Sequence, residues 1–160
     1  MNDMPLMPDT QLAVRFRRLP HAQGLPPPTY AEAGAAGLDL AAAIDGKEPL
    51  VIWPHRLPVL VPTGFQIEIP HGYEGQVRPR SGLTSRTGLT VANAPGTIDA
   101  SFRGEVKIAL INNGPQPVEI KRGDRVAQLV IAPVARMRVI ETDELSETAR
   151  GAGGWGSTGS

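Results

Sequence analysis

Apolar and polar residues alternate in many short runs, a pattern that predicts a protein built from β-strands. In the run Phe65-Gln-Ile-Glu-Ile69, every second residue is apolar, so one face of the strand can be buried while the other stays polar. Turn residues separate the runs, as at 62–64 and at 121–124, where Lys-Arg-Gly-Asp is typical of a hairpin turn. Strands are expected over 11–19, 35–41, 57–61, 65–69, 73–79, 89–92, 96–99, 105–111, 118–120, 125–131 and 134–140.

One short helix is expected over residues 81–88. Ser81 can cap its first turn and Gly88 can end it. Longer helices are disfavoured because 16 prolines and 18 glycines are spread along 160 residues, and a proline inside a helix costs about 3 kcal/mol. A chain of this length forms one domain with a substantial core. The expected fold class is all-β, a sandwich or barrel with one short helix.

Charge and composition disfavour several classes of function. Lys+Arg 16 against Asp+Glu 16 gives a net charge of zero, whereas nucleic-acid and anionic membrane surfaces attract basic proteins. Cysteine is absent, which excludes disulfides and thiolate metal sites, and the three histidines are scattered, so a zinc site is not expected. The sequence shows neither a secretory signal nor an apolar run long enough to span a bilayer, so a cytoplasmic location is expected.

The stretch 93–105 carries the most informative chemistry. Asp99 ends a short apolar run and Gly104 closes a tight connection to the next strand, which predicts a β-hairpin. The amide of Asn93 suits the edge of a pyrimidine, the Asp99 carboxylate suits activation of water, and Phe102 adds a ring. Simpler interpretations are a turn asparagine, an Asx-turn aspartate and a core ring. We expect half of a pocket for a small planar ligand.

Polar residues in three other places could bind phosphate or metal. Arg80, Ser81 and Gly82 open the expected helix, where free N–H groups and a guanidinium favour an anion. Asp39 lies between apolar neighbours and could face a hydrated Mg²⁺. Gln128 is polar inside an apolar strand, and a ligand phosphate could satisfy its amide. Each has a simpler interpretation: residues 80–82 as an ordinary helix start, Asp39 as an acid in a capped turn, and Gln128 as an amide bonded to the backbone.

The segment 145–160 is rich in glycine, serine and threonine and holds one arginine and one tryptophan. It could fold over a nucleotide, with Arg150 on the terminal phosphate, Trp155 stacked on the base and backbone N–H groups around phosphate oxygens. Disorder, which is common in glycine-rich termini, is the better supported interpretation of this segment taken alone.

Taken together and in order, these five stretches resemble the five motifs of the homotrimeric dUTP pyrophosphatase (dUTPase) family, over residues 37–159. The resemblance implies an all-β jelly roll, or β-clip barrel, that forms a homotrimer in which each active site gathers motifs from all three subunits. It also implies a disordered N-terminus (1–10), a β domain (11–141) and a mobile C-terminal arm (142–160) that closes over the substrate.

The reaction implied by the resemblance is the Mg²⁺-dependent hydrolysis of dUTP to dUMP and diphosphate, which keeps uracil out of DNA and supplies dUMP for dTMP synthesis. The implied partners are dUTP and further copies of the chain, with neither nucleic acid nor membrane. Asp99 is the implied catalytic base, and Asp39 orients the metal through water. The implied substrate contacts are Arg80, Ser81, Gly82, Asn93, Gly96, Thr97, Ile98, Phe102, Gln128, Arg150, Trp155, Gly156, Ser157 and Thr158.

Two residues depart from the family pattern. A tyrosine is usual where this chain has Phe102, and a phenylalanine is usual where it has Trp155. Both retain an aromatic face, so we expect discrimination against a 2′-hydroxyl and stacking on the base to persist.

Two other functions remain as alternatives. The dCTP deaminase family shares the fold, but it carries a catalytic glutamate on the strand after the aspartate, near Ala109 of this chain. A non-catalytic, nucleotide-binding regulatory trimer would be favoured by loss of Asp99 or of the arm, and the sequence retains both.

Overall fold

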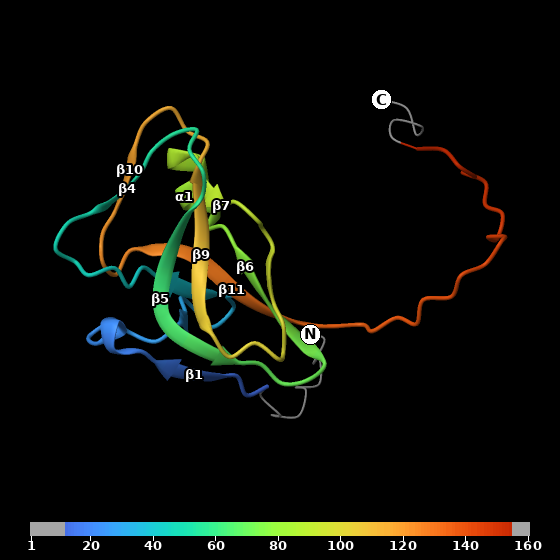
Figure 1. Cartoon of the computed structure of the whole chain (residues 1–160), viewed down its shortest axis with the longest axis horizontal. Coiled ribbons are helices and arrows are strands. Elements are labelled where there is room, and N and C mark those ends of the chain that lie inside the picture. The colour runs from blue at the N-terminus through green and yellow to red at the C-terminus, as the bar shows by residue number, and fades with distance from the viewer. Residues whose placement is uncertain (1–11, 155–160) are drawn as a thin grey trace, which may run out of the picture.

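The computed structural model describes residues 12–154 and shows antiparallel β-sheets packed around one core (Figure 1). One sheet has the order β1-β5-β9-β7, another has the order β2-β3-β11-β6-β8, and β10 pairs with β4. The strands are β1 (Arg15–Arg18), β2 (Thr29–Tyr30), β3 (Leu38–Ala41), β4 (Leu50–Ile52), β5 (Val59–Glu68), β6 (Tyr73–Arg78), β7 (Leu89–Val91), β8 (Gly96–Ile98), β9 (Glu105–Asn112), β10 (Val118–Ile120) and β11 (Arg125–Pro133). The all-β prediction is confirmed.

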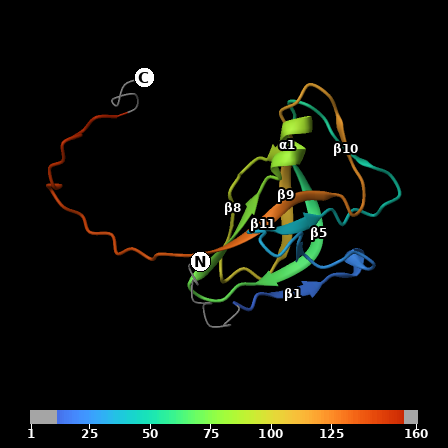
Figure 2. The same ribbon diagram turned by 180° about the vertical axis from the view of Figure 1, so that it is seen from behind.

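Both large sheets contribute to the core. Ile108 and Leu110 of β9 are fully buried, and they belong to the same cluster as Leu129 of β11 and Val77 of β6. Along β9, buried residues alternate with more exposed ones, as the sequence pattern predicted. Figure 2, which shows the molecule from behind, places β8 and β11 on the side opposite β5 and β9 of Figure 1.

The predicted turn at 62–64 does not exist, because β5 runs straight through it as one strand. Its pairing with β9 shifts register between Pro62 and Gln66, so the extra residues form a bulge rather than a reversal of the chain. Gly64 has φ +72° there, and the Thr63 hydroxyl donates to the Val106 carbonyl at 2.7 Å. Residues 62–64 are therefore accommodated in the bulge, and the strand continues through them.

The predicted hairpin over 93–105 is also wrong in its pairing. β8 pairs with β6 in one sheet, whereas β9 pairs with β5 and β7 in the other. Residues 99–104 therefore connect two sheets. The turn at 121–124 is present, with the Asp124 carboxylate accepting the Lys121 N–H at 2.7 Å, but β10 and β11 likewise lie in different sheets. Local sequence predicts the reversal of the chain but not the partner of each strand.

Helix α1 (Ser81–Thr87) is confirmed, and Gly88 ends it in the left-handed conformation with φ 77°. Ser81 is not its cap, because Arg80 occupies the N-cap position and its carbonyl accepts the N–H groups of Leu83 and Thr84 at 3.0 Å. The short elements β2, β4 and a 3-10 helix, η1 (Pro20–Ala22), were not predicted. None of the helices in the described part of the chain is long and apolar enough to cross a membrane.

The predicted strand over 134–140 is absent, and β11 is the last strand of residues 12–154. Beyond the Val134 N–H, which donates to the Gly72 carbonyl at 2.8 Å, the chain leaves the domain as an extended segment (Figures 1 and 2). The alternation of residues in this segment is that of a strand, but a single chain offers it no partner strand. The prediction that residues 1–10 are disordered lies outside the described residues.

Candidate active site

A cavity of about 220 Å³ opens between β8 and β9, where the two large sheets meet. In the stretch 93–105, sequence analysis assigned six residues to contacts with the base, the sugar and the attacking water. All six line this cavity. The lining residues are Val77, Asn93, Gly96, Thr97, Ile98, Asp99, Phe102, Glu105, Val106, Lys107 and Ala109. The expected pocket therefore exists, although its walls come from two different sheets rather than from a hairpin.

The connection from β8 to β9 sets the positions of the acid and the ring. The Phe102 N–H donates to the Asp99 carbonyl at 3.0 Å, which closes a turn just after β8. The Phe102 ring then lies against Gly104, where an added Cβ would come within 2.7 Å of the ring. A side chain at position 104 would push the ring away, so Gly104 permits this packing. Asp99 is exposed, and the Phe102 side chain is 38% exposed.

Asn93 lies on the opposite wall and is placed by close packing with β8. A Cβ added at Gly96 would lie 3.2 Å from the Asn93 amide nitrogen and 3.4 Å from the Cβ of Val77. The amide thus rests against the strand backbone with its polar atoms near the cavity. Glu105, Lys107 and Ala109 of β9 also line the cavity, and sequence analysis did not assign these to the site. The only available signal was their position directly after the Asp99 stretch.

A second cluster forms around Asp39 on β3. The Asp39 carboxylate binds Arg80 Nε through one oxygen and Arg125 Nη1 through the other, each at 2.9 Å. Its side chain is 16% exposed. A further donor of Arg80 reaches the Arg125 carbonyl at 3.2 Å. Two of the residues that the sequence assigned to metal and phosphate, Asp39 and Arg80, are therefore in direct contact, and Arg125 is a partner that sequence analysis missed.

Gln128 lies beside this cluster, because it is directly opposite Asp39 in the pairing of β11 with β3. Its amide Nε2 donates to the Pro79 carbonyl at 2.9 Å, so one donor is used by the backbone, as the alternative interpretation expected. A Cβ added at Gly37 would lie 2.5 Å from the Gln128 amide oxygen, so a side chain there would displace the Gln128 amide. Ser81 and Gly82 start α1 and are exposed.

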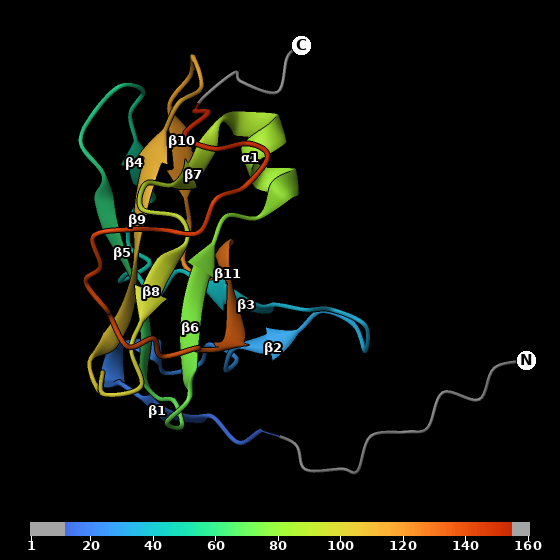
Figure 3. The same ribbon diagram turned by 90° about the vertical axis from the view of Figure 1, so that its right-hand side faces the viewer.

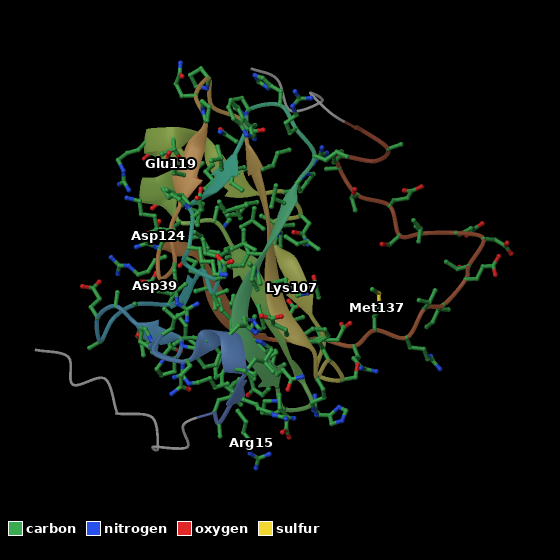
Figure 4. All side chains as sticks on the ribbon, turned by 60° about the vertical axis from the view of Figure 1, so that its left-hand side comes forward. Arg15, Asp39, Lys107, Glu119, Asp124 and Met137 are labelled. Carbon is green, nitrogen blue, oxygen red and sulfur yellow. The ribbon has the colours of Figure 1, made fainter. Side chains whose placement is uncertain are left out.

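One chain does not bring the two clusters together. The cavity that contains Asp99 is lined by none of Asp39, Arg80 and Gln128. Strands β8 and β3 are separated by β6 and β11 (Figure 3), a separation of about 14 Å at the usual strand spacing. Figure 4 likewise shows Asp39 apart from Lys107, which lines the Asp99 cavity.

The C-terminal residues assigned to the substrate are not placed at either cluster. Arg150 donates to the carbonyls of Gly153 and Gly154 at 3.1 and 3.3 Å, so these contacts stay within its own segment. That segment extends away from the domain (Figure 1). Trp155, Gly156, Ser157 and Thr158 lie outside the described residues.

Comparison with known proteins decides the family. A family model described as dUTPase matches residues 24–159. The chain belongs to the dUTPase family. A deoxyuridine 5′-triphosphate nucleotidohydrolase of Rhizobium rhizogenes is 53% identical over 156 residues, covering 98% of this chain and 99% of the relative. One of Methylocella silvestris is 57% identical over 148 residues, covering 92% of each.

Solved structures agree with the fold of this dUTPase-family chain. A Staphylococcus bacteriophage 80alpha dUTPase with dUpNHpp has a TM-score of 0.75 and 25% identity, and the match covers 92% of this chain and 99% of that one. A mutant dUTPase from phage phi11 of S. aureus, in which a structural Mg(II) ion is coordinated, has a TM-score of 0.72 and 25% identity over 84% of this chain. The predicted dUTPase-like fold class is thereby confirmed, as is the prediction of a dUTPase-type hydrolase.

Proposed function

We propose that this dUTPase-family protein hydrolyses dUTP to dUMP and diphosphate, with Asp99 activating the attacking water. The observation that carries the proposal is the gathering of Asn93, Asp99 and Phe102 around one small cavity. An amide offers both a donor and an acceptor to a pyrimidine edge, and an exposed carboxylate can take a proton from water. The family membership supplies the substrate class.

Selection of the nucleotide follows from the lining of the cavity. Uracil would enter beside Asn93 and the backbone of Gly96, Thr97 and Ile98, which line the cavity, and the methyl group of thymine would clash with this wall. Such exclusion discriminates through a clash rather than through added attraction. The Phe102 ring would pack beneath the deoxyribose and leave no room for a 2′-hydroxyl.

The triphosphate would be bound by the second cluster. Arg80 uses Nε on Asp39, and its guanidinium keeps further donors for phosphate oxygens. Ser81 and Gly82 add the first N–H groups of α1, and Gln128 adds the second hydrogen of its amide. Bound next to the α-phosphorus, these groups would stabilise the negative charge that moves onto the diphosphate as the bond to the leaving oxygen breaks.

A hydrated Mg²⁺ is compatible with Asp39. Each oxygen of its carboxylate accepts one guanidinium donor and keeps lone-pair capacity for a water molecule. The described residues contain no group of three or more His, Asp or Glu side chains suited to direct metal binding. Magnesium usually retains several waters and binds substrate phosphates together with few carboxylates. When bound with the triphosphate, it would supply charge neutralisation, and Asp39 would orient its water shell.

Three copies of the chain would complete each site. The separation of the two clusters within one chain supports this proposal, since the α-phosphorus must lie near both Asp99 and Arg80. The domain also exposes apolar side chains that suit a subunit interface, including Leu60 on the outer face of β5, which is 63% exposed. In the extended segment, Met137 and Val139 are 88% and 84% exposed, and Figure 4 shows Met137 outside the domain.

The C-terminal arm, residues 142–160, would close over bound substrate. Arg150 would bind the terminal phosphate, Trp155 would stack on uracil, and Gly156, Ser157 and Thr158 would surround phosphate oxygens. Closure would exclude water other than the attacking molecule. The extended path of residues 134–154, with Arg150 held only by its own segment, leaves the arm able to reach a neighbouring subunit.

Release of diphosphate from dUTP, dCTP, dTTP and UTP, measured side by side, tests the substrate assignment. We expect efficient release from dUTP alone. Ammonia release from dCTP, with no diphosphate from dUTP, would instead support the deaminase alternative. Tight dUTP binding without either product would support the regulatory alternative. At the position where the deaminase family carries its glutamate this chain has Ala109, whose methyl group offers no proton-transferring atom.

Mixing of inactive variants tests whether sites are shared. Asp99→Asn and Arg80→Ala would each be inactive as homotrimers. Subunits exchanged between them would form some sites with both residues intact, so activity should reappear after mixing. Failure of activity to reappear, with subunit exchange confirmed by mass spectrometry, would contradict sharing.

A further inference from the structure

Glu105 lines the cavity that contains Asp99, yet one oxygen of its carboxylate is bound to groups outside the cavity. Its Oε1 accepts the Gly64 N–H at 2.8 Å and lies 2.7 Å from the Nε2 of His21. Its Oε2 has only a loose contact with the Lys107 ammonium at 3.9 Å. The Glu105 side chain is 14% exposed. With Oε1 committed to two partners, this acid is a structural anchor rather than a free base.

The two partners of Glu105 belong to a rigid part of the fold. His21 lies on η1, whose next residue, Ala22, is fully buried against Phe65. Gly64 sits in the β5 bulge, where an added Cβ would come within 2.2 Å of the Ala22 Cβ. The Gly64 carbonyl also accepts the Leu19 N–H at 2.8 Å. The anchor therefore ties β9 to two packed segments.

The anchored residue begins β9, immediately after the connection that carries the proposed catalytic groups. Glu105 follows Gly104, and Gly104 is the residue against which the Phe102 ring packs. At the other end of the connection, Ile98 is fixed by its pairing with Gly75 of β6. The connection 99–104 is thus held at one end by the pairing of β8 with β6, and at the other by the pairing of Glu105 with Gln66 of β5 together with the Glu105 carboxylate.

We propose that His21 and Glu105 are positioning residues that hold the 99–104 connection, and with it the Phe102 ring, in the geometry that distinguishes deoxyribose from ribose. This inference rests on the proposed function, because it assigns the ring to the sugar. His21 is not among the residues that line the cavity, and the polar contact of its side chain is with Glu105, so it would act through Glu105. Loss of these side-chain contacts leaves only the backbone pairing of Glu105 with Gln66 at that end of the connection. The ring then has more freedom to move and closes less tightly the space that a 2′-hydroxyl would occupy.

The test measures kcat/KM for dUTP and for UTP in the full-length protein. His21→Ala and Glu105→Ala should each lower the ratio of the two values about tenfold, the scale expected when a charge-assisted hydrogen bond is lost. Glu105→Gln should retain most of the ratio, because its amide oxygen can still accept the Gly64 N–H and a hydrogen bond from His21 Nε2, which both meet the same oxygen of Glu105. Phe102→Ala supplies the reference for complete loss of the ring.

Controls separate positioning from general damage. Glu119→Gln changes an exposed acid on β10 and should leave the ratio unchanged. Thermal unfolding and sedimentation identify variants that are unfolded or dissociated. If the Glu105 variants fail in this way, His21→Ala decides the test, because it retains Glu105 and its bond to Gly64. An unaltered ratio in a folded His21→Ala protein overturns the inference. Absence of dUTP hydrolysis by the unmodified protein would instead contradict the proposed function.

Discussion

The guanidinium of Arg80 and the carboxylate of Asp39 are in direct contact, with Nε and Oδ1 2.9 Å apart. The contact joins the start of α1 to β3, and Nη1 of the same arginine donates to the Arg125 carbonyl at 3.2 Å. Since Arg125 binds the other oxygen at 2.9 Å, one carboxylate orients two cations. The charge balance of this cluster can be tested directly.

Asp39→Asn should weaken both folding and activity. The amide can accept from only one arginine and turns its own donors toward the other, so the partly buried Arg80 and the exposed Arg125 lose their shared anion. We expect a loss of about 1–3 kcal/mol in the free energy of unfolding and a clear fall in kcat/KM for dUTP. Urea unfolding and steady-state kinetics measure the two effects. Asp45→Asn, at an exposed position, should change neither, and an equal effect at both positions would contradict the special role of Asp39.

Gly64→Ala should strongly destabilise the fold. Its φ of +72° disfavours any side chain, and the new methyl group would lie 2.2 Å from the Ala22 Cβ. Backbone strain and overpacking together should cost about 2–5 kcal/mol. Gly72→Ala is a matched control, because its φ is +86° with no atom within 4 Å of the added Cβ. That variant should lose only about 1–2 kcal/mol. Equal urea midpoints for the two variants, compared at one protein concentration, would show that steric crowding at Gly64 is unimportant.

Asn112→Ala should destabilise the fold, because it removes a fully buried amide. Asn112 donates to the carbonyls of Ile52 and Gln116 at 2.9 and 2.8 Å, and it accepts the Gly114 N–H at 2.9 Å. Removing it leaves two buried backbone groups and one partly buried carbonyl without these partners, a loss of about 2–4 kcal/mol. The neighbouring exposed Asn113→Ala should be nearly neutral. Thermal melting of the two variants makes the comparison, and a Tm for Asn112→Ala as high as that of Asn113→Ala would be inconsistent with this account.

Deletion of residues 150–160 should separate folding from catalysis. These residues follow the last strand, which ends at Pro133, and the described part of the segment contributes no side chain to the core. The shortened protein should unfold at nearly the same temperature and sediment as the same oligomer, but turn over dUTP very slowly. Unchanged kcat and KM would refute a catalytic role for the arm.

Sequence patterns predicted much of the fold, because burial on one face of a strand leaves a local alternation. The strand at 105–111 and the helix closed by Gly88 were found in this way. The bulge at Gly64 was predicted as a turn, since a glycine with positive φ is typical of both, and the pairing of β5 with β9 on both sides of the bulge distinguishes them. Strand partners were not predictable, because β8 and β9 are adjacent in sequence but pair in different sheets.

In the candidate site too, some residues could be predicted from the sequence and others could not. The order of the five motifs indicated Asn93, Asp99 and Phe102, and the structure places all three on one cavity. Arg125 and Glu105 were missed, because their importance lies in contacts with residues distant in sequence, Asp39 and His21. Residues that hold a catalytic group through a distant partner leave no motif of their own.

The most direct test of the central claim is single-turnover hydrolysis of dUTP by Asp99→Asn, measured together with its equilibrium binding of dUTP. Asparagine keeps the size and polarity of the side chain but cannot take a proton from water. Binding should stay close to that of the unmodified protein, while the hydrolysis rate should fall by about 10²–10⁴-fold. A rate near that of the unmodified protein, with dUTP bound normally, would contradict the assignment of Asp99 as the base.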